Sequence, residues 1–453
     1  MKRMVLDYLL LWKDRNNRKP LVIRGARQTG KTFIVDELGR NYFQSYININ
    51  LEQRVDLWPI FKTPNPKQII NELSVLLNRK IEPGKTLLFL DEVQSCPDAF
   101  VVLRYFYEQL PELHVIAVGS LLEHSLNDSK YAMPVGRIEF CNMFPMNFEE
   151  FLMACGEDLL LEYLKQYRLS APFSEAIHIR SLELLRQYIF IGGMPEAVAS
   201  YITSKDLTDV ERIQNSIVTT FQYDFAKYGS KPEQEYLRIV FNSIPGNIGK
   251  KIKYSNIDGN IRSTYLKEAL KKLERSCIVT LVRHTAGNGI PLSDDMKEDV
   301  FKPLFLDIGL LNRMGGIKLI RIEELFTIKE RILAEQFIGQ EFLTSVDYYA
   351  EPGLFYWLRE NKNANAEVDY LWQYQNEIIP VEVKAGNSGS LKSLQVFLAE
   401  KKLDKALRFN IAMPSEGIFT HHLHVGGEKK EISFKLLNLP LYLCFRAKEL
   451  ISL

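Results

Sequence analysis

The stretch LVIRGARQTGKT (21–32) decides the fold of the N-terminal part of this 453-residue chain. Its last eight residues fit the pattern G-x-x-x-x-G-K-[ST], and they lie between an apolar run typical of a buried strand and the helical stretch TFIVDELGR (32–40). Gly25 and Gly30 allow a tight turn whose backbone N–H groups converge on a phosphate, and the following helix directs the positive end of its dipole at the same charge. The stretch therefore predicts a strand, a phosphate-binding loop and a helix.

The side chains of this loop indicate how a nucleotide is held. Lys31 is expected to bridge the β- and γ-phosphates of ATP, and the Thr32 hydroxyl is expected to bind Mg²⁺. ATP and Mg²⁺ are therefore the predicted cofactors. We predict that the whole run binds ATP, namely Gly25, Ala26, Arg27, Gln28, Thr29, Gly30, Lys31 and Thr32.

A second motif, TLLFLDEVQ (86–94), is an apolar strand that ends in two carboxylates. Asp91 is expected to hold Mg²⁺, and Glu92 is expected to polarise the attacking water as a general base. Taken alone, the same pair also fits an acidic cap between a strand and a helix. Because it follows a phosphate-binding loop in the same chain, the catalytic interpretation is favoured.

Two polar residues near the next strands are further candidates. Ser120 ends HVIAVGS (114–120), where it is predicted to act as a sensor between the catalytic water and the γ-phosphate, or to cap the strand. Arg137 is predicted to contact the phosphate of this or a neighbouring subunit as an arginine finger, or to form a surface ion pair. The residues alone leave both pairs of alternatives open.

A local excess of positive charge marks a second region. Residues 227–275 carry 11 Lys and Arg against 5 Asp and Glu, whereas the whole chain has a net charge of +1. The order of helix, short helix, helix and strand hairpin is that of a winged helix-turn-helix. The basic helix 262–275 is predicted to bind DNA, although such a fold can also serve protein contacts. The candidate DNA-binding residues are Arg262, Lys267, Lys271 and Lys272.

Acidic residues and a lysine meet near the end of the chain. Period two places Glu382 and Lys384 on the same face of one strand, and a tight turn at 375–376 brings the strand of Asp369 alongside. Two carboxylates that hold Mg²⁺ beside a lysine suit phosphodiester hydrolysis. The set is similar to the PD-(D/E)xK nuclease core, with Asp369 and Glu382 as metal ligands and Lys384 and the helix residue Glu335 as catalytic groups. A cross-strand ion pair, or a decayed core used for binding, is the alternative.

These motifs together resemble the ATPase half of a large bacterial and archaeal group of AAA+-like proteins whose C-terminal half is a domain of unknown function. The resemblance implies ATP binding and hydrolysis. Serines commonly follow the glycine of the sensor strand in that group, but this chain has GSLLEHS, so only Ser120 carries over. The resemblance rests on GARQTGKT, LLFLDEVQ, the GS of VIAVGS, GRIEF, GGMPEAV, STYLKEALKKLE, KPLFLDIGL and AEQF…EVDY…VEVK.

Composition excludes several classes of protein. Hydrophobic residues make up 46% of the chain and charged residues 25%, which is too apolar for disorder. No apolar run approaches the ~18 residues that span a bilayer, and the five scattered cysteines form no C-x-x-C pair. The triplet of histidines in HHLH (421–424) has no neighbouring cysteine and is interpreted as a polar strand edge rather than a metal site. We expect a cytoplasmic protein with reduced thiols and no membrane partner.

We therefore predict a multidomain α/β fold in which nucleotide state controls how the C-terminal half engages DNA. Two other classes stay open: a nucleotide-switched signalling or regulatory scaffold with a decayed nuclease core, and a winged-helix DNA-binding regulator. Homo-oligomers are also left open. The predicted domains are a parallel-sheet P-loop ATPase (1–148), a helical lid or bridge (149–225), a winged helix-turn-helix (226–318) and a restriction-endonuclease-like α/β domain (319–453).

Overall fold

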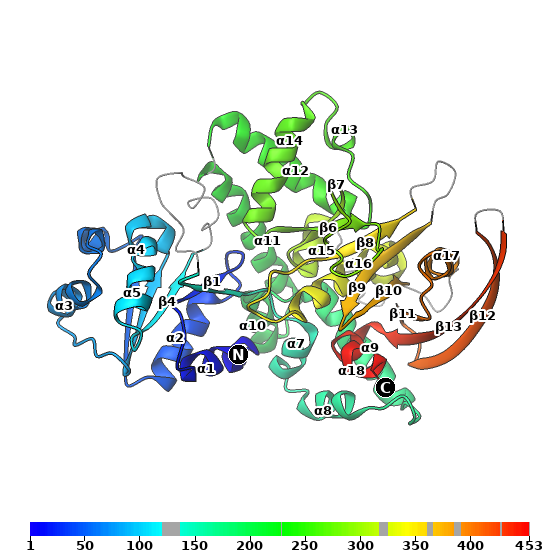
Figure 1. The fold of residues 1–453 in the computed structure, drawn as a ribbon, viewed down its shortest axis with the longest axis horizontal. Helices are drawn as coiled ribbons and strands as arrows, with labels where there is room; N and C mark the ends of the chain where they lie inside the picture. The colour runs from blue at the N-terminus through cyan, green and yellow to red at the C-terminus, as the bar shows by residue number, and fades with distance from the viewer. Residues whose placement is uncertain are drawn as a thin grey trace. The chain divides into compact units, whose positions relative to one another are not determined.

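The structure, a computed structural model, divides into two compact units (Figure 1). The first comprises Met1–Pro145, Lys272–Ile278 and Val346–Glu351, and the second comprises Met146–Lys271, Val279–Ser345 and Pro352–Leu453. No helix among the described residues has both the length and the apolar character needed to cross a membrane. The described residues are 1–119, 136–227, 229–316, 325–359, 366–384, 391–425 and 428–452.

The first unit is built on a five-stranded parallel sheet in the order β2-β3-β4-β1-β5. The predicted parallel α/β arrangement of this region is confirmed. The order is typical of P-loop folds because the loop after β1 and the acidic end of β3 reach the same edge of the sheet. The strands are β1 (Leu21–Arg24), β2 (Ser45–Asn50), β3 (Thr86–Asp91), β4 (His114–Val118) and β5 (Glu139–Asn142).

Helices cover both faces of this sheet, as period two in the strands requires. Leu21 and Ile23 pack on one side against α1 (Val5–Asp14) and α2 (Lys31–Tyr42). Val22, between them, belongs to the core on the opposite side. That second core includes apolar residues of η1 (Val55–Lys62), α3 (Pro66–Leu77), α4 (Pro97–Val101) and α5 (Leu103–Gln109) (Figure 1).

A short segment from far along the chain completes this unit. Asn142, at the end of β5, donates its backbone N–H to the carbonyl of Tyr348 over 2.7 Å. Its side-chain amide also donates to the carbonyl of Ala350 over 2.8 Å. The ring of Tyr348 lies 5.5 Å from that of Tyr8 on α1. The residues Val346–Glu351 are thus part of the same unit as the phosphate-binding loop.

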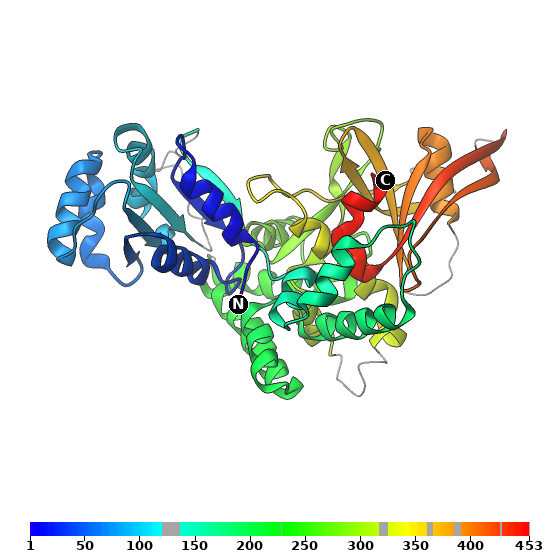
Figure 2. The same ribbon diagram turned by 90° about the horizontal axis from the view of Figure 1, so that it is seen from below.

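The second unit begins with helices and ends in one large sheet. A mixed eight-stranded sheet has the order β12-β13-β11-β10-β9-β8-β6-β7. Figure 2 shows its long orange-to-red hairpin, β12 (Ser415–Val425) and β13 (Glu428–Pro440), of which the sequence predicted only a polar strand edge at 421–424. The other strands are β6 (Val279–Thr285), β7 (Met296–Phe305), β8 (Phe355–Leu358), β9 (Glu367–Tyr374), β10 (Glu377–Val383) and β11 (Lys405–Asn410).

The hairpin expected as the wing joins this large sheet. Arg283 and His284 of β6 pair in parallel with Phe355 and Tyr356 of β8. The predicted boundary at 318/319 therefore falls between strands of one sheet, and the domain boundaries stay a prediction. The helices of this unit are α7 (Phe148–Ala154), α8 (Asp158–Gln166), α9 (Glu175–Ile191), α10 (Pro195–Ser204), α11 (Leu207–Asp224), α12 (Lys231–Asn247), α13 (Tyr254–Ile257), α14 (Ser263–Arg275, whose last turn belongs to the first unit), α15 (Ile308–Met314), α16 (Leu325–Thr344), α17 (Lys392–Lys401) and α18 (Ala447–Ile451).

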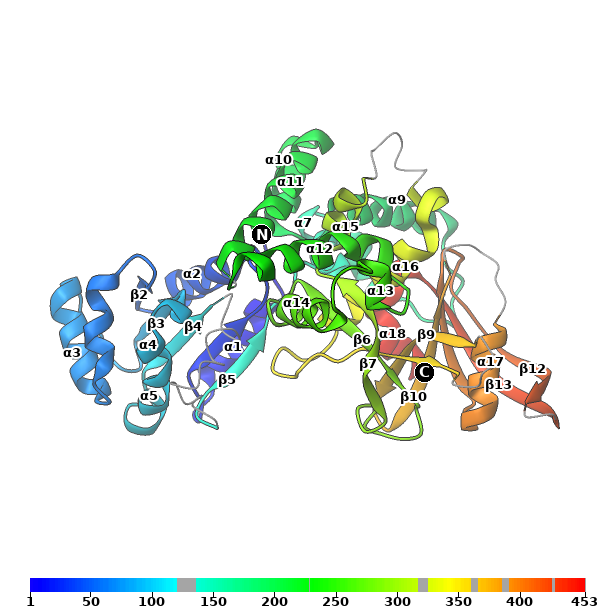
Figure 3. The same cartoon turned by 90° about the horizontal axis from the view of Figure 1, so that it is seen from above.

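Two motifs of the resemblance meet in the core of the second unit. The Asp307 carboxylate accepts hydrogen bonds from the N–H groups of Gly193 (2.6 Å) and Leu310 (3.0 Å). A Cβ at Gly192 would lie 2.2 Å from the same carboxylate, so GGMP (192–195) requires a glycine there. The contact joins the end of α9 to the start of α15, which lies beside it (Figure 3). These residue types are thus explained by packing.

Candidate functional sites

The loop between β1 and α2 turns at two glycines. Gly25 has φ +145° and Gly30 has φ +90°, which are values that other residues rarely adopt. A Cβ at Gly25 would lie 2.1 Å from the carbonyl oxygen of Met143, in the segment that follows β5. The loop backbone is therefore held against the neighbouring chain, and Gly25 is the residue that permits this approach.

Lys31, the first residue of α2, closes the loop on itself. Its ammonium group donates hydrogen bonds to the carbonyls of Gly25 (3.0 Å) and Ala26 (2.6 Å). Burial lowers the pKa of Lys31 to about 8 because removal from water disfavours the charged form. A cation held by loop carbonyls can exchange them for the oxygens of a phosphate, which are stronger acceptors.

Thr32 and Asp91 form the adjoining part of the site. The Thr32 hydroxyl donates to Oδ2 of Asp91 over 3.1 Å, and the Glu92 N–H donates to Oδ1 over 3.0 Å. Burial, followed by the nearby charge of Glu92, raises the pKa of Asp91 to about 6. A hydroxyl and a buried carboxylate this close are oxygen ligands of the kind that Mg²⁺ prefers, so the residues fit the ion that accompanies a bound nucleotide.

Glu92, the predicted general base, directly follows Asp91 at the end of β3. It adopts the left-handed backbone region with φ +50° directly after β3. Its carboxylate accepts a hydrogen bond from the Gln94 side-chain amide. Since a non-glycine residue in this region stores strain, the conformation is held by its surroundings.

Of the other two candidates in this region, only Arg137 lies among the described residues. Ser120 lies outside the described residues. Arg137 is exposed, and its guanidinium forms an ion pair with Glu108 over 2.8 Å. The ion pair is the alternative that the sequence had left open for Arg137, and the arginine finger stays a prediction.

Arg3 is a residue of this site that sequence reasoning missed. Its guanidinium is buried and donates to the carbonyl of Thr29 in the loop (2.9 Å) and to that of Phe144 (2.8 Å). It thus links the phosphate-binding loop to the segment after β5. No pattern around Arg3 signals this role, since its partners are 26 and 141 residues away.

The C-terminal acidic residues do come together in the second unit. Glu335, Asp369 and Glu382 are 3%, 2% and 4% exposed. Oδ2 of Asp369 accepts a hydrogen bond from the N–H of Val383 over 2.8 Å, and Lys384 forms an ion pair with Glu382. Burial, followed by the charge of Asp369, raises the pKa of both Glu335 and Glu382 to about 7. Glu335, Glu382 and Lys384 also line a cavity of about 520 Å³.

These carboxylates, as placed, do not fit a metal ion. Among the described residues no group of three His, Cys, Asp or Glu side chains is arranged to hold one. Instead Arg331, one turn before Glu335 on α16, donates to Oε1 of Glu335 over 2.6 Å and to Oδ1 of Asp369 over 3.1 Å. Sequence reasoning missed Arg331, although its spacing of four from Glu335 on a helix is a signal of contact.

Comparison with known proteins divides the chain into three matched regions. Residues 17–152 match the model of a family described as an AAA domain. This part of the chain is therefore similar to AAA-type P-loop ATPase domains. Residues 182–320 and 332–420 match two different families, each described as a domain of unknown function. A comparison with curated proteins gives no match.

Solved structures resemble the chain only distantly. The Walker-type ATPase PABY2304 of Pyrococcus abyssi has 14% identity and a TM-score of 0.43, over 69% of this chain and 95% of that one. The ORC2 protein of Aeropyrum pernix, in complexes with ADPNP and ADP, has 15% identity and a TM-score of 0.36, over 72% and 94%. Because both TM-scores are below 0.5, we draw nothing from these likenesses.

The predicted DNA-binding residues lie on or before α14, outside the matched AAA domain. Arg262 is exposed and precedes the helix, and Lys267 and Lys271 are half-buried on it. Lys267 forms an ion pair with Asp299 of β7, and Lys271 lies 4.0 Å from Glu268. Lys272 is half-buried in the last turn. Part of the local positive charge is therefore neutralised within the protein.

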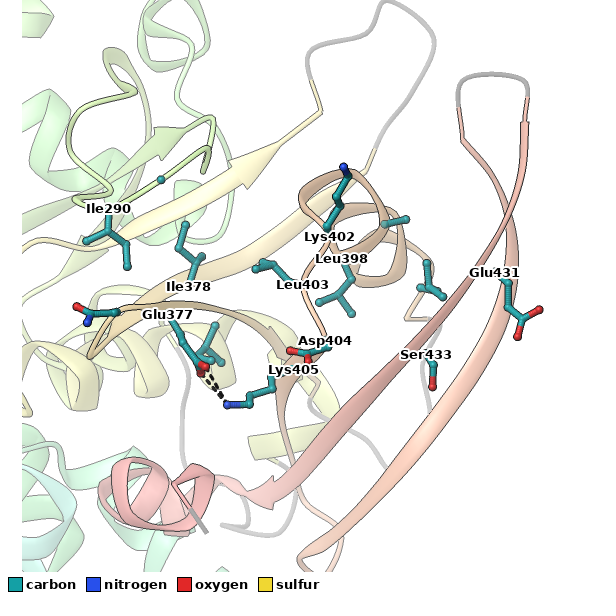
Figure 4. A pocket seen from close by; sticks show the side chains of 15 residues that line it. Ile290, Glu377, Ile378, Leu398, Lys402, Leu403, Asp404, Lys405, Glu431 and Ser433 are labelled. Carbon is teal, nitrogen blue, oxygen red and sulfur yellow. Dashed lines mark hydrogen bonds and ion pairs between the residues drawn. The ribbon is translucent and has the colours of Figure 1, made fainter.

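A larger cavity, of about 820 Å³, lies elsewhere in the second unit (Figure 4). Apolar side chains such as Leu398 and Leu403 line it, and Glu377 and Lys405 form an ion pair across 2.9 Å at its edge. Its lining holds none of the predicted site residues. In β12, His421 and His422 are exposed, as expected for a polar strand edge.

Proposed function

We propose that the AAA domain binds Mg·ATP and hydrolyses it. The observation that carries the proposal is the joint placement of Lys31 in the loop and of Thr32 against Asp91. Lys31 would neutralise the β- and γ-phosphates, Thr32 and Asp91 would hold Mg²⁺, and Glu92 would orient and deprotonate the attacking water. The bound ion supplies charge neutralisation of the phosphates.

Substitution of Lys31 tests this proposal. In the full chain, Lys31→Ala is expected to abolish Mg-dependent ATP hydrolysis and to weaken binding of a fluorescent ATP analogue. Glu92→Gln is expected to keep binding but lose hydrolysis, because only the base is removed. If Lys31→Ala binds and hydrolyses ATP as the wild type does, the proposed role of the loop is wrong.

The state of the bound nucleotide, ATP or ADP, would be transmitted to the C-terminal half of the chain through segments of that half that belong to the first unit. Val346–Glu351 follows α16, the helix that carries Glu335, and Tyr348 in it hydrogen-bonds to Asn142 next to the loop-packing residue Met143. This connection supports the proposal that ATP controls a DNA-binding or nuclease-like module. In a DNA cleavage assay with Mg²⁺ or Mn²⁺, loss of cutting in both Asp369→Ala and Lys384→Ala would support a nuclease.

A scaffold with a decayed nuclease core is the second candidate function. Arg331, which contacts two of the three carboxylates, is the observation that favours it. In that case no cleavage is expected from the wild type under any nucleotide condition. Limited proteolysis would still differ between protein with ATP and protein with ADP.

A further inference from the structure

The eight-stranded sheet of the second unit has a gap beside β13. The pairing of β13 with β11 starts at Lys435, which lies opposite Lys405, the first residue of β11. Residues 428–434 of β13 pair with β12 on one side, and no described strand pairs with their other side. This part of β13 therefore has a free strand edge inside the sheet.

A second free edge lies across the gap on β10, since β10 and β13 flank β11 in the sheet. β10 begins at Glu377, but its pairing with β11 begins at Val381, and Pro380 has no N–H with which to extend that pairing. Because neighbouring strands lie about 4.8 Å apart, two strands that flank a third leave room for one extended backbone. We call the space between residues 377–380 of β10 and residues 428–434 of β13 the strand slot.

Backbone groups of β13 point into the strand slot. The N–H of Lys435 donates to the carbonyl of Asp404 over 2.7 Å, which places the backbone groups of Lys435 on the side of β11. Alternate residues of a strand direct these groups to the same side, so those of Ser433 and Glu431 point there as well. No residue that the structure describes hydrogen-bonds to the N–H or C=O of Ser433 or Glu431.

β10 contributes a hydrogen-bond donor from the opposite wall of the strand slot. The N–H of Lys384 donates to the carbonyl of Phe409 in β11 over 2.8 Å. Ile378 lies an even number of residues before Lys384, so its N–H points to the same side. That N–H has no hydrogen-bond partner in the described part of the chain. Both walls therefore offer backbone groups that an added strand can use.

One face of the strand slot is apolar. Ile378 of β10 and Ile432 of β13 pack in the same cluster as Leu398 of α17 and Leu403, which follows that helix. All four side chains line the cavity of about 820 Å³ (Figure 4). Side chains of a bound strand that point toward α17 would therefore contact hydrocarbon and leave water, which is favourable.

The other face of the strand slot is polar. Glu377 and Lys405 form an ion pair across 2.9 Å, and Ser433 and Glu431 of β13 are exposed. Because charges of both signs line this face, it does not favour a strongly charged ligand. Successive side chains of an extended chain point to opposite faces, so the occupant that fits both faces alternates apolar and uncharged polar residues.

We propose that the strand slot binds an extended peptide segment of a partner protein, which adds a strand between β10 and β13. An extended peptide carries N–H and C=O groups along both of its edges, so it can bond to Ser433 and Glu431 on one side and to Ile378 on the other. Its apolar side chains contact Leu398 and Leu403. The proposal goes beyond ATP binding and does not depend on it.

A synthetic peptide tests the proposal on the full chain. The probe is a fluorescein-labelled hexapeptide of alternating valine and threonine, and its binding is measured by fluorescence anisotropy. The same peptide with N-methylated threonines loses the N–H donors of one edge, so it is expected to bind about tenfold more weakly or worse. The proposal is overturned if the wild type does not bind the first peptide, or binds both equally.

A matched pair of proline variants assigns the binding to the strand slot. Ser433 and Thr420 lie opposite each other in the hairpin, and their hydroxyls are 3.3 Å apart. Ser433→Pro removes an N–H that points into the slot and is expected to weaken peptide binding about tenfold, whereas Thr420→Pro removes one at the outer edge of β12 and is expected to have no effect. Equal effects of the two variants would overturn the proposal.

Two further measurements keep the test decisive. If Ser433→Pro does not fold, Leu403→Gln, which removes an apolar contact and leaves the backbone intact, is expected to weaken peptide binding several-fold, and unchanged binding would overturn the proposal. Sedimentation of the chain without peptide tests a second copy as the occupant. Self-association that Ser433→Pro abolishes and Thr420→Pro preserves would assign the slot to a second copy and overturn the proposal.

Discussion

Thr32 Oγ1 donates a hydrogen bond to Oδ2 of Asp91 across 3.1 Å. The contact joins the first turn of α2, the helix that follows β1, to the end of β3, and β4 lies between β1 and β3 in the sheet. Taken singly, a threonine at the start of a helix and an aspartate at the end of a strand are both common. Because the Thr32 hydroxyl and the Asp91 carboxylate lie this close together, both could bind the same Mg²⁺.

Thr32→Ala is expected to remove the magnesium dependence of ATP binding, because the ion loses its hydroxyl ligand. Thr32→Ser, which keeps the hydroxyl, is expected to behave nearly as the wild type. Titration of a fluorescent ATP analogue with and without Mg²⁺ measures the difference. Equal magnesium dependence in Thr32→Ala and the wild type would contradict the assignment.

Gly25→Ala is expected to destabilise the AAA domain by more than about 1 kcal/mol, because a Cβ would overlap Met143 O in a backbone region suited to glycine. ATP binding should weaken with it. Gly84→Ala is the matched control, since Gly84 also has a positive φ but has no atom within 4 Å of its added Cβ. Thermal unfolding of both variants separates the effect of atomic overlap from that of backbone strain. A larger loss of stability in Gly84→Ala than in Gly25→Ala would contradict the overlap with Met143.

Arg3→Ala is expected to weaken ATP binding about tenfold, since a charged hydrogen bond to the loop carbonyl of Thr29 is worth roughly 1.5–3 kcal/mol. Because Arg3 positions the loop without touching the reacting atoms, KM should rise more than kcat falls. Arg3→Lys should recover part of the loss. Lys2→Ala, at an exposed neighbour, serves as the control and should leave both constants unchanged.

Glu341→Gln is expected to change how stability depends on pH. Burial raises the pKa of Glu341 to about 8 from 4.5, and its Oε1 accepts the N–H of Phe148 over 2.9 Å. Between these pH values the folded chain holds a proton that the unfolded chain has lost, so stability falls as pH rises, by at most ~1.4 kcal/mol per unit. The glutamine side chain still offers an oxygen to the Phe148 N–H but does not titrate, so the variant does not lose stability in this way as the pH rises.

Urea unfolding at pH 5, 7 and 9 measures this effect. The advantage of Glu341→Gln over the wild type should grow from pH 5 to pH 8 and then level off. A constant difference across the range would show that Glu341 does not titrate in this window.

Replacement of Lys267, Lys271 and Lys272 by glutamine tests DNA binding through α14. If these lysines contact phosphates, binding of duplex DNA should weaken at low salt, and the slope of log affinity against log salt should fall by up to about 3. ATP hydrolysis should survive. Replacing Lys67, Lys80 and Lys85, three exposed lysines of the AAA domain, is the control, and an equal effect there would exclude a specific role for α14.

Local sequence determined much of the AAA domain. The loop needs glycines at Gly25 and Gly30 because the backbone must turn in regions closed to other residues, and strand periodicity places Val22 opposite Leu21 and Ile23. The same reasoning predicted the tight turn at 375–376, where β9 and β10 pair antiparallel. Such features depend on neighbours a few residues apart, so a single sequence contains them.

Only the tertiary structure decided which distant groups share a site. Three interactions depend on how segments far apart in the sequence pack together. They are the hydrogen bond from Arg3 to the carbonyl of Thr29, the one from Asn142 to the carbonyl of Tyr348, and the contacts of Arg331 with buried carboxylates. The union of β6 with β8 in one large sheet has the same origin. The sequence predicted which acidic residues form the C-terminal core. The strength of charge interactions in a buried site, however, depends on every charged group that lies nearby in space. Residue spacing alone therefore could not predict the role of Arg331.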